Sequence, residues 1–286
     1  MVELLESTAV GPYLLTRALA PCAFAERHLA LHEPDHSSHV AYRFSGARSR
    51  QVRRRLESAI SACRQLDHEH LLPVEDVVES DGDVWVMCPF TGDVDGIRTL
   101  SKLLREKRGQ MDPFEAERAM EQLLDAVAHA HTRVVHGPIR MDDVLVDRHG
   151  RLLIEFYGLR RALSGASAAA DPEDIRDEVR SIVEIGYQLV TGLRAEEPMI
   201  PAGRVVKKLD PAFDRWLSKG LDPAAGFESA AQALAEIPCR GVTDHEFDEP
   251  ADAEGVRRVW RSPFGGLSGA IEGVRVVIGR LRGVPR

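Results

Sequence analysis

Polar side chains that could do chemistry gather in one short stretch near the middle of the chain. Residues 136–143, read HGPIRMDD, supply an imidazole, a guanidinium and two carboxylates. Two apolar runs follow, at 144–146 and 152–154, and the polar turn between them ends in glycine, which predicts a β-hairpin. A second tight element, 156–158 (FYG), comes next. Loops before and after a hairpin lie side by side at one of its ends, so we expect a functional site there.

This stretch resembles the catalytic core of the eukaryotic-type Ser/Thr protein kinases, including their bacterial members. That family reads His-Arg-Asp-Leu-Lys-Pro-Glu-Asn, then a hairpin, then Asp-Phe-Gly. The chain keeps this frame but changes its chemistry. Pro138 stands at the position of the catalytic Asp, and a proline ring cannot accept a proton. Phe156 stands at the position of the metal-binding Asp, and a phenyl ring cannot bind Mg²⁺, which prefers hard oxygen ligands.

Two charged residues remain in the frame. Asp143 replaces the Asn that holds a second Mg²⁺ in the family, and Arg140 replaces the Lys that contacts the transferred phosphate. The resemblance therefore implies that no catalytic residue is intact and that no metal site survives beyond, at most, Asp143. The apolar ring of Phe156 can instead turn inward and fill the pocket.

The first part of the chain resembles the nucleotide-binding strands of the family without their glycine-rich loop. Alternating apolar and polar residues in 10–32 predict two strands joined by a loop. Ala20, Cys22 and Ala25 occupy the three glycine positions. Each adds a Cβ where backbone amides must approach phosphates closely, so we expect weak or lost nucleotide binding there.

The resemblance also places residues around an adenine pocket. Ala41 and Arg43 fall at the Ala and Lys positions of the third strand, 39–44. Arg43 either lies over a phosphate or extends its head into solvent. Met87 falls at the gatekeeper position, and Cys88 to Phe90 form the hinge, where the Phe90 amide usually meets adenine.

Helical spacing of apolar residues predicts most of the remaining elements. We expect helices at 48–66, 114–132 and 174–192 and two more within 210–237. In the first of these, Ala59 falls where the family has the Glu that pairs with the strand Lys. Glu178 falls where the family has an Asp that anchors the catalytic loop. Residues 159–171, rich in Ala, Ser and Gly, indicate a shortened activation segment, which we interpret as a flexible linker.

Together these features predict an α+β fold with two lobes, similar to a protein kinase: a small β-rich N-lobe and a helical C-lobe. We expect the N-lobe at 1–90, the C-lobe with its shortened activation segment at 91–238, and an acidic linker followed by a basic amphipathic tail at 239–286.

The end of the chain and its composition bear on partners and location. Residues 243–254 are acidic and 255–286 basic, so this tail could bind a protein partner, lie on an anionic membrane or fold back onto its own domain. A net charge of -8 argues against nucleic-acid binding. The four cysteines lack metal or redox spacing and read as reduced residues, so we expect a cytoplasmic protein, with or without membrane association.

The sequence thus predicts a catalytically inactive kinase-like domain, a pseudokinase, that acts as a binding, scaffolding or allosteric module. We expect no cofactor: ATP would bind weakly, and Mg²⁺ not at all. The alternative is an atypical ATP-dependent Ser/Thr protein kinase or another nucleotide-dependent transferase that uses Arg43, Arg140, Asp142 and Asp143. A third reading is a pure interaction module acting through the linker and tail.

Overall fold

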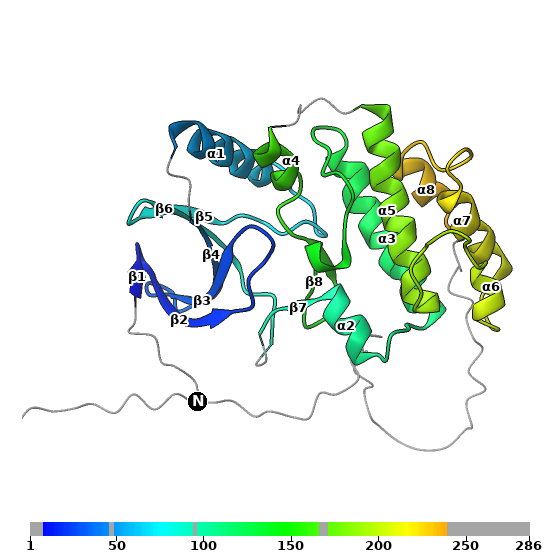
Figure 1. The fold of residues 1–286 in the computed structure, drawn as a ribbon. Coiled ribbons are helices and arrows are strands. Elements are labelled where there is room, and N and C mark those ends of the chain that lie inside the picture. The colour runs from blue at the N-terminus through cyan, green and yellow to red at the C-terminus, as the bar shows by residue number, and fades with distance from the viewer. Residues whose placement is uncertain (1–7, 46–48, 94–95, 166–170, 239–286) are drawn as a thin grey trace, which may run out of the picture.

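The computed structural model describes residues 8–45, 49–93, 96–165 and 171–238 of the chain. The first half of this part is an antiparallel sheet in the order β1-β2-β3-β4-β6-β5 (Figure 1). Its strands are β1 (Thr8–Val10), β2 (Tyr13–Leu19), β3 (Glu26–His32), β4 (Ser38–Phe44), β5 (Asp76–Ser80) and β6 (Asp83–Pro89). One helix, α1 (Arg50–Arg64), lies beside this sheet and begins where the Ser49 side chain accepts a hydrogen bond from Val52 N.

The two faces of this sheet pack against different groups, because successive side chains of a strand point to opposite sides. Val40, Tyr42 and Phe44 of β4 share a buried cluster with Leu56 and Ile60 of α1. Intervening residues of β4 and β6 face the other side, where the buried side chains are Val10, Tyr13, Leu15, Ala30, Ala41, Trp85 and Met87. The first face also shares its cluster with Leu145, Leu153 and Leu159 of the second half of the described chain.

The second half of the described chain is mostly helical. Its helices are α2 (Leu100–Glu106), α3 (Pro113–Ala130), α4 (Leu159–Ser164), α5 (Pro172–Thr191), α6 (Ala202–Val205), α7 (Pro211–Leu221) and α8 (Ala230–Glu236). A small sheet of β7 (Arg98–Thr99), β8 (Val144–Val146) and β9 (Leu152–Ile154) lies between the helices and the larger sheet, and a 3₁₀ turn, Met141–Asp143, precedes β8.

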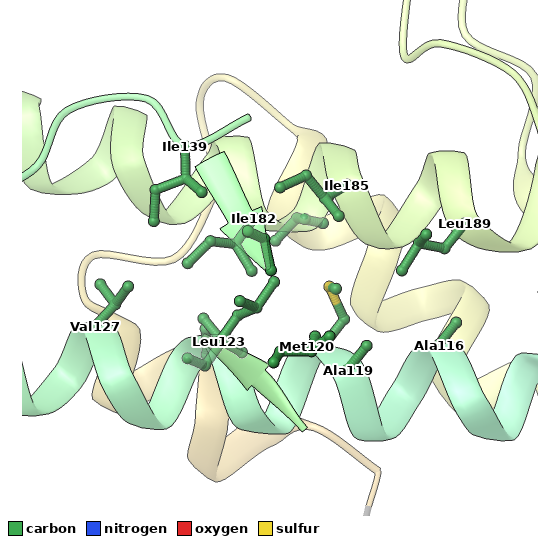
Figure 2. Packing of buried hydrophobic residues seen from close by; sticks show 14 of the residues in the cluster. Ala116, Ala119, Met120, Leu123, Val127, Ile139, Ile182, Ile185 and Leu189 are labelled. Atoms are coloured by element: carbon green, nitrogen blue, oxygen red, sulfur yellow. The ribbon is translucent and has the colours of Figure 1, made fainter. Parts of the chain in front are cut away.

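Helices α3 and α5 pack against each other and form the centre of this half. Figure 2 shows Met120 and Leu123 of α3 directed toward Ile182 and Ile185 of α5, and all four side chains are buried. Asp112 caps α3 by accepting from Phe114 N, with Pro113 in the first turn. This rigid pair supports the loops that lead into and out of the β8–β9 hairpin.

The two-lobed α+β architecture expected from the sequence is confirmed: the N-terminal part is rich in strands and the C-terminal part in helices. One prediction was wrong in part, because residues 159–164 of the expected flexible linker form helix α4. Leu159 of this helix is fully buried in the cluster that contains Leu56 of α1, which explains why the segment is ordered. The predicted linker and tail at 239–286 lie outside the described residues. Within the described ranges, no helix is long and apolar enough to cross a membrane.

Candidate functional site

The hairpin β8–β9 is held firmly at the junction of the two lobes. Its register pairs Val144 with Ile154, and the turn is closed by the Asp147 side chain, which accepts from the backbone N–H groups of His149 and Arg151. Ile154 also pairs with the segment after α1: its N–H donates to His70 O, at 2.9 Å. The residues that follow Ile154 are therefore delivered to the inner face of the large sheet.

Phe156 fills the space that faces this sheet. Its side chain is fully buried, and its ring centroid lies 4.6 Å from that of Tyr42, 5.7 Å from Phe44 and 5.9 Å from Phe24. All three contacts have edge-to-face geometry, which aromatic pairs prefer. The backbone of Phe156 has φ 44°, an uncommon value for a bulky residue, so the surrounding contacts hold it in this conformation.

A buried ion pair lies beside this ring. Arg27 of β3 donates from one guanidinium nitrogen to both carboxylate oxygens of Glu155, at 2.5 Å each, and the side chains are only 3% and 2% exposed. The guanidinium also lies over the Tyr42 ring, 5.6 Å from its centroid. Burial raises the pKa of Glu155 more than the Arg27 cation lowers it. The pair joins residues 128 positions apart and bridges the two lobes.

Asp143, the remaining carboxylate at a family metal position, is occupied by cations of the protein itself. Arg160 of α4 donates to its Oδ1 at 2.6 Å, and the backbone N–H of Arg140 donates to its Oδ2 at 3.1 Å. The Arg140 side chain is more distant, with Nε 3.7 Å from Oδ2, and is 62% exposed. Both oxygens that could bind a cation therefore already have donors. This arrangement does not fit a Mg²⁺ ion at Asp143.

The loop that precedes Asp143 is anchored as the family resemblance implied. Glu178 of α5 is fully buried, and its carboxylate accepts from the backbone N–H groups of His136 and Gly137, at 2.8 and 2.9 Å. The Tyr157 hydroxyl donates to the same carboxylate. Burial lowers the pKa of His136, and its Nδ1 accepts from Gly158 N at 3.0 Å, so the imidazole is neutral and helps to order the turn after Phe156.

The loop that replaces the glycine-rich loop folds inward. Cys22 N–H donates to Ala25 O at 3.0 Å, and Arg27 donates to Ala20 O at 3.3 Å. Phe24, between these residues, packs its ring in the cluster around Phe156. The hinge amide is also used internally, because Phe90 N–H donates to Ser38 O at 3.3 Å. The loop and the Phe90 amide are therefore both hydrogen-bonded within the protein.

The structure brings together only some of the residues singled out in the sequence. Ala25, Cys22, Cys88 and Phe90 contribute to the cluster that contains Phe156, and Arg140 lies beside Asp143. Pro138 is exposed.

Two positions, Ala41 and Met87, lie elsewhere than the family frame implied, and Arg43 takes the second of its two expected positions, directed away from the inner face. Ala41 and Met87 are buried on the opposite face of the large sheet. Arg43 also faces away, with its guanidinium 2.7 Å from Asp83 and over the Trp85 ring, and its side chain is 40% exposed. The physical reason is strand alternation, since an offset of one residue reverses the face. Val40 and Tyr42 point inward in place of Ala41 and Arg43.

The sequence reasoning missed the residues that occupy the cleft. Arg27, Tyr42, Glu155 and Arg160 were not singled out. The sequence did contain a pattern that could have revealed Arg27 and Tyr42. Each lies two residues from an apolar residue, in or next to its own strand, that faces inward, so strand alternation places it on the same face. Arg160 and Glu155 carry no such signal, since a charged residue next to a turn is usually solvated.

Comparisons with known proteins show which proteins this chain is similar to. No protein-family model matches the chain. The Ser/Thr protein kinase PrkC of Bacillus subtilis is 29% identical over 126 residues, which is 44% of this chain and 19% of that protein. The carbon catabolite-derepressing protein kinase of Candida tropicalis is 25% identical over 84% of this chain and 40% of its own length. The chain thus spans well under half the length of these relatives. A crystal structure of the Mycobacterium tuberculosis PknI kinase domain, a double mutant, superposes with a TM-score of 0.64 at 19% identity, covering 82% of this chain and 98% of that one.

Proposed function

We propose that this chain, which has the protein-kinase fold and is related to Ser/Thr protein kinases, is a catalytically inactive module that acts by binding and regulation. The observation that supports the proposal is the packing of Phe156 among Phe24, Tyr42 and Phe44, in the region where the family resemblance places the nucleotide. Phe156 occupies the inner face of the sheet, and Arg160 neutralises Asp143. A cytoplasmic location suits such a module.

The chemistry of phosphoryl transfer explains why these contacts favour loss of activity. Catalysis of this reaction is almost entirely positioning of the phosphates and neutralisation of their charge by metal ions. In this cleft the position of the principal metal ligand is a phenyl ring, and the position of the base is Pro138. The buried cation beside the Phe156 ring, Arg27, is already paired with Glu155, so a triphosphate would have to break this ion pair in order to bind Arg27. We therefore infer weak ATP binding, no Mg²⁺ and no other cofactor.

ATP should leave the thermal stability of the protein unchanged. A ligand at one hundred times its dissociation constant stabilises the folded state by about 2.7 kcal/mol, so binding at working concentrations would be visible as a rise in Tm. We expect no rise with millimolar ATP, either with or without Mg²⁺, in a thermal-shift titration. The control is an active protein kinase under the same conditions.

Two results would contradict this proposal. One is a Mg²⁺-dependent rise in Tm at micromolar ATP. The other is autophosphorylation, followed by mass spectrometry, that is lost in the Asp143→Ala variant. The second result would favour the atypical kinase or transferase, which the names of the relatives make the natural alternative.

A binding module also needs a surface, and a groove between α1 and α4 offers one. The groove has a volume of about 640 Å³. Its apolar lining comes from Ala59, Ala62, Val134, Tyr157 and Ala162. Arg50, Arg54 and Arg55 of α1 also line it, and among the described residues none of these three is paired with a carboxylate. An apolar floor with cations along one side fits an acidic segment that carries an apolar anchor.

We propose that the occupant is the acidic segment of this chain, residues 243–254, where Phe247 lies between acidic residues. Ile237, at the end of α8, lines the same surface hollow as His70, which follows α1 closely. The residues between Ile237 and position 243 can span about 20 Å when extended. Docking there would leave the basic tail, 255–286, to contact a partner protein or an anionic surface.

A synthetic peptide of residues 243–254 should bind the chain truncated after Pro238, and charge reversal in the groove should weaken binding at least about tenfold, since rim charges act through long-range attraction. Fluorescence anisotropy of the labelled peptide measures this for the Arg54→Glu/Arg55→Glu variant. Arg204→Glu/Arg215→Glu, which changes the net charge equally on α6 and α7, is the matched control. Equal weakening by both pairs, or no binding by the unaltered protein, would reject the groove as the docking site.

A further inference from the structure

We infer that the hairpin joining β3 and β4 contains a site for a divalent transition metal of the zinc class, formed by His32, Asp35 and His39. One ligand atom from each of these residues lies within 4.8 Å of the others. Imidazole nitrogens with one carboxylate oxygen are a donor set typical of zinc, and one shared with nickel and copper. The site lies at one end of the large sheet, apart from the filled cleft.

The three donors converge on one small polar group. His32 Nδ1 lies 2.8 Å from Asp35 Oδ1, so two of the ligand atoms are already in contact. The Ser37 hydroxyl lies 2.7 Å from the same carboxylate oxygen and 2.6 Å from His39 Nε2. A metal ion would take over the role of the hydroxyl between carboxylate and imidazole. Of the three ligand side chains, Asp35 is exposed and the two imidazoles are partly buried.

Neighbouring groups already orient both imidazoles. Glu75 Oε2 lies 2.8 Å from His39 Nδ1, the ring nitrogen opposite the proposed ligand atom, in ion-pair contact rather than in an aligned hydrogen bond. Metal-binding histidines almost always have such a partner, which fixes the ring and increases its basicity. The Tyr13 ring packs on both imidazoles, with centroids 4.8 Å from that of His32 and 5.3 Å from that of His39.

The strands and the carboxylate complete the arrangement. In the sheet, His32 pairs with Tyr13, and His39 pairs with Pro89 of β6, so backbone hydrogen bonding fixes both histidines. The Asp35 carboxylate accepts from the Ser37 backbone N–H at 3.0 Å and from the Ser37 hydroxyl at 2.7 Å, which orients it toward the two histidines. Three protein ligands leave the fourth coordination position of a tetrahedral zinc ion for a water molecule.

A bound ion would join the end of β3 to the start of β4. The adjacent residue, Ser38, accepts the hydrogen bond from Phe90 N–H at the connection between the lobes. The metal would therefore stabilise the hairpin that holds this connection.

The test uses the full chain freed of metal with EDTA and titrated with ZnCl₂ by isothermal calorimetry. We expect one zinc site. His32→Gln and Asp35→Asn should each weaken zinc binding about tenfold or more, because loss of a residue that merely supports a metal ligand already weakens metal binding about 10–100-fold. His36→Asn is the matched control: His36 lies in the same turn, is exposed and has φ 58°, which Asn tolerates. It should bind zinc as the unaltered protein does.

Cobalt(II) distinguishes this site from the cysteines. The Co²⁺ complex should show d–d absorption without the near-ultraviolet band of cobalt–thiolate bonds, and zinc should raise Tm in the unaltered protein and in His36→Asn only. Asp35 is 62% exposed, so its substitution should not prevent folding and keeps the test decisive if a histidine variant fails to fold. Three results would overturn the inference. They are a cobalt–thiolate band, an equal loss of zinc affinity in His36→Asn, and no zinc binding at about 100 µM Zn²⁺, which corresponds to a binding free energy weaker than roughly 5 kcal/mol.

Discussion

Replacing Phe156 by alanine should lower the free energy of unfolding by about 3–5 kcal/mol, the range found for deleting a buried phenyl ring. The reason is that this ring is fully buried and contacts three other aromatic rings, none of which can move into the vacated space without losing its own contacts. Urea denaturation followed by circular dichroism measures the change. Its magnitude would make Phe156 a main element of the core.

Phe114 provides the control for this experiment. It is also a phenylalanine, but its side chain is 40% exposed at the start of α3, so Phe114→Ala should cost less than about 1 kcal/mol. A loss below about 1 kcal/mol for Phe156→Ala would mean that the ring is not packed as described. In that case the cleft would be open, and the argument for an occupied nucleotide site would fail with it.

The second large effect concerns the ion pair beside the ring. Arg27→Met should destabilise the protein by about 3–5 kcal/mol, because it leaves the Glu155 carboxylate buried without a counter-charge. The double variant Arg27→Met/Glu155→Met should be more stable than Arg27→Met alone, since neither charge then remains. A double-mutant cycle measures this coupling. Additive losses would contradict it.

The same variant should show a diagnostic pH dependence. The pKa of Glu155 in the folded protein is already raised by burial, and loss of Arg27 should raise it further. A raised folded-state pKa means that the folded protein binds the proton more tightly than the unfolded chain. Its stabilising effect is present below the unfolded pKa, about 4.5, and is lost as pH rises through the folded pKa. Arg27→Met should therefore lose stability relative to the unaltered protein as pH rises above about 4.5.

Arg43→Met is the matched control for Arg27→Met. Arg43 also pairs with a carboxylate, Asp83, but its side chain is 40% exposed. Exposed ion pairs contribute about 0–1 kcal/mol, so this substitution should change stability little and without the same pH dependence.

Local patterns were enough to predict most of the fold. Apolar spacing indicated α1, α3 and α5, and the polar turn indicated the β8–β9 hairpin, because these signals depend on residues close together in the sequence. The Glu178 anchor was also foreseen by resemblance, since the order of elements fixes which helix faces the loop at His136.

The occupants of the cleft could not be predicted in the same way. Which face of β4 points inward depends on register with β3 and β6, and a one-residue offset exchanged Arg43 with Tyr42. The Arg27–Glu155 contact joins strand β3 to the turn that follows β9, in different lobes. No periodicity in either segment encodes that meeting. Residues 159–164 form a helix because Leu159 packs into the buried cluster beneath α1. This is a tertiary contact, so the local sequence likewise did not predict it.

The Arg27–Glu155 pair has a consequence for motion. Separating the lobes would expose the Phe156 ring and pull a guanidinium from a carboxylate in a buried environment, where breaking such a pair costs about 3–5 kcal/mol. Partial opening should therefore be rare relative to complete unfolding. In native-state hydrogen exchange, amides of β3, β4 and β9 should then share one opening free energy and behave as a single cooperative unit across the lobe boundary.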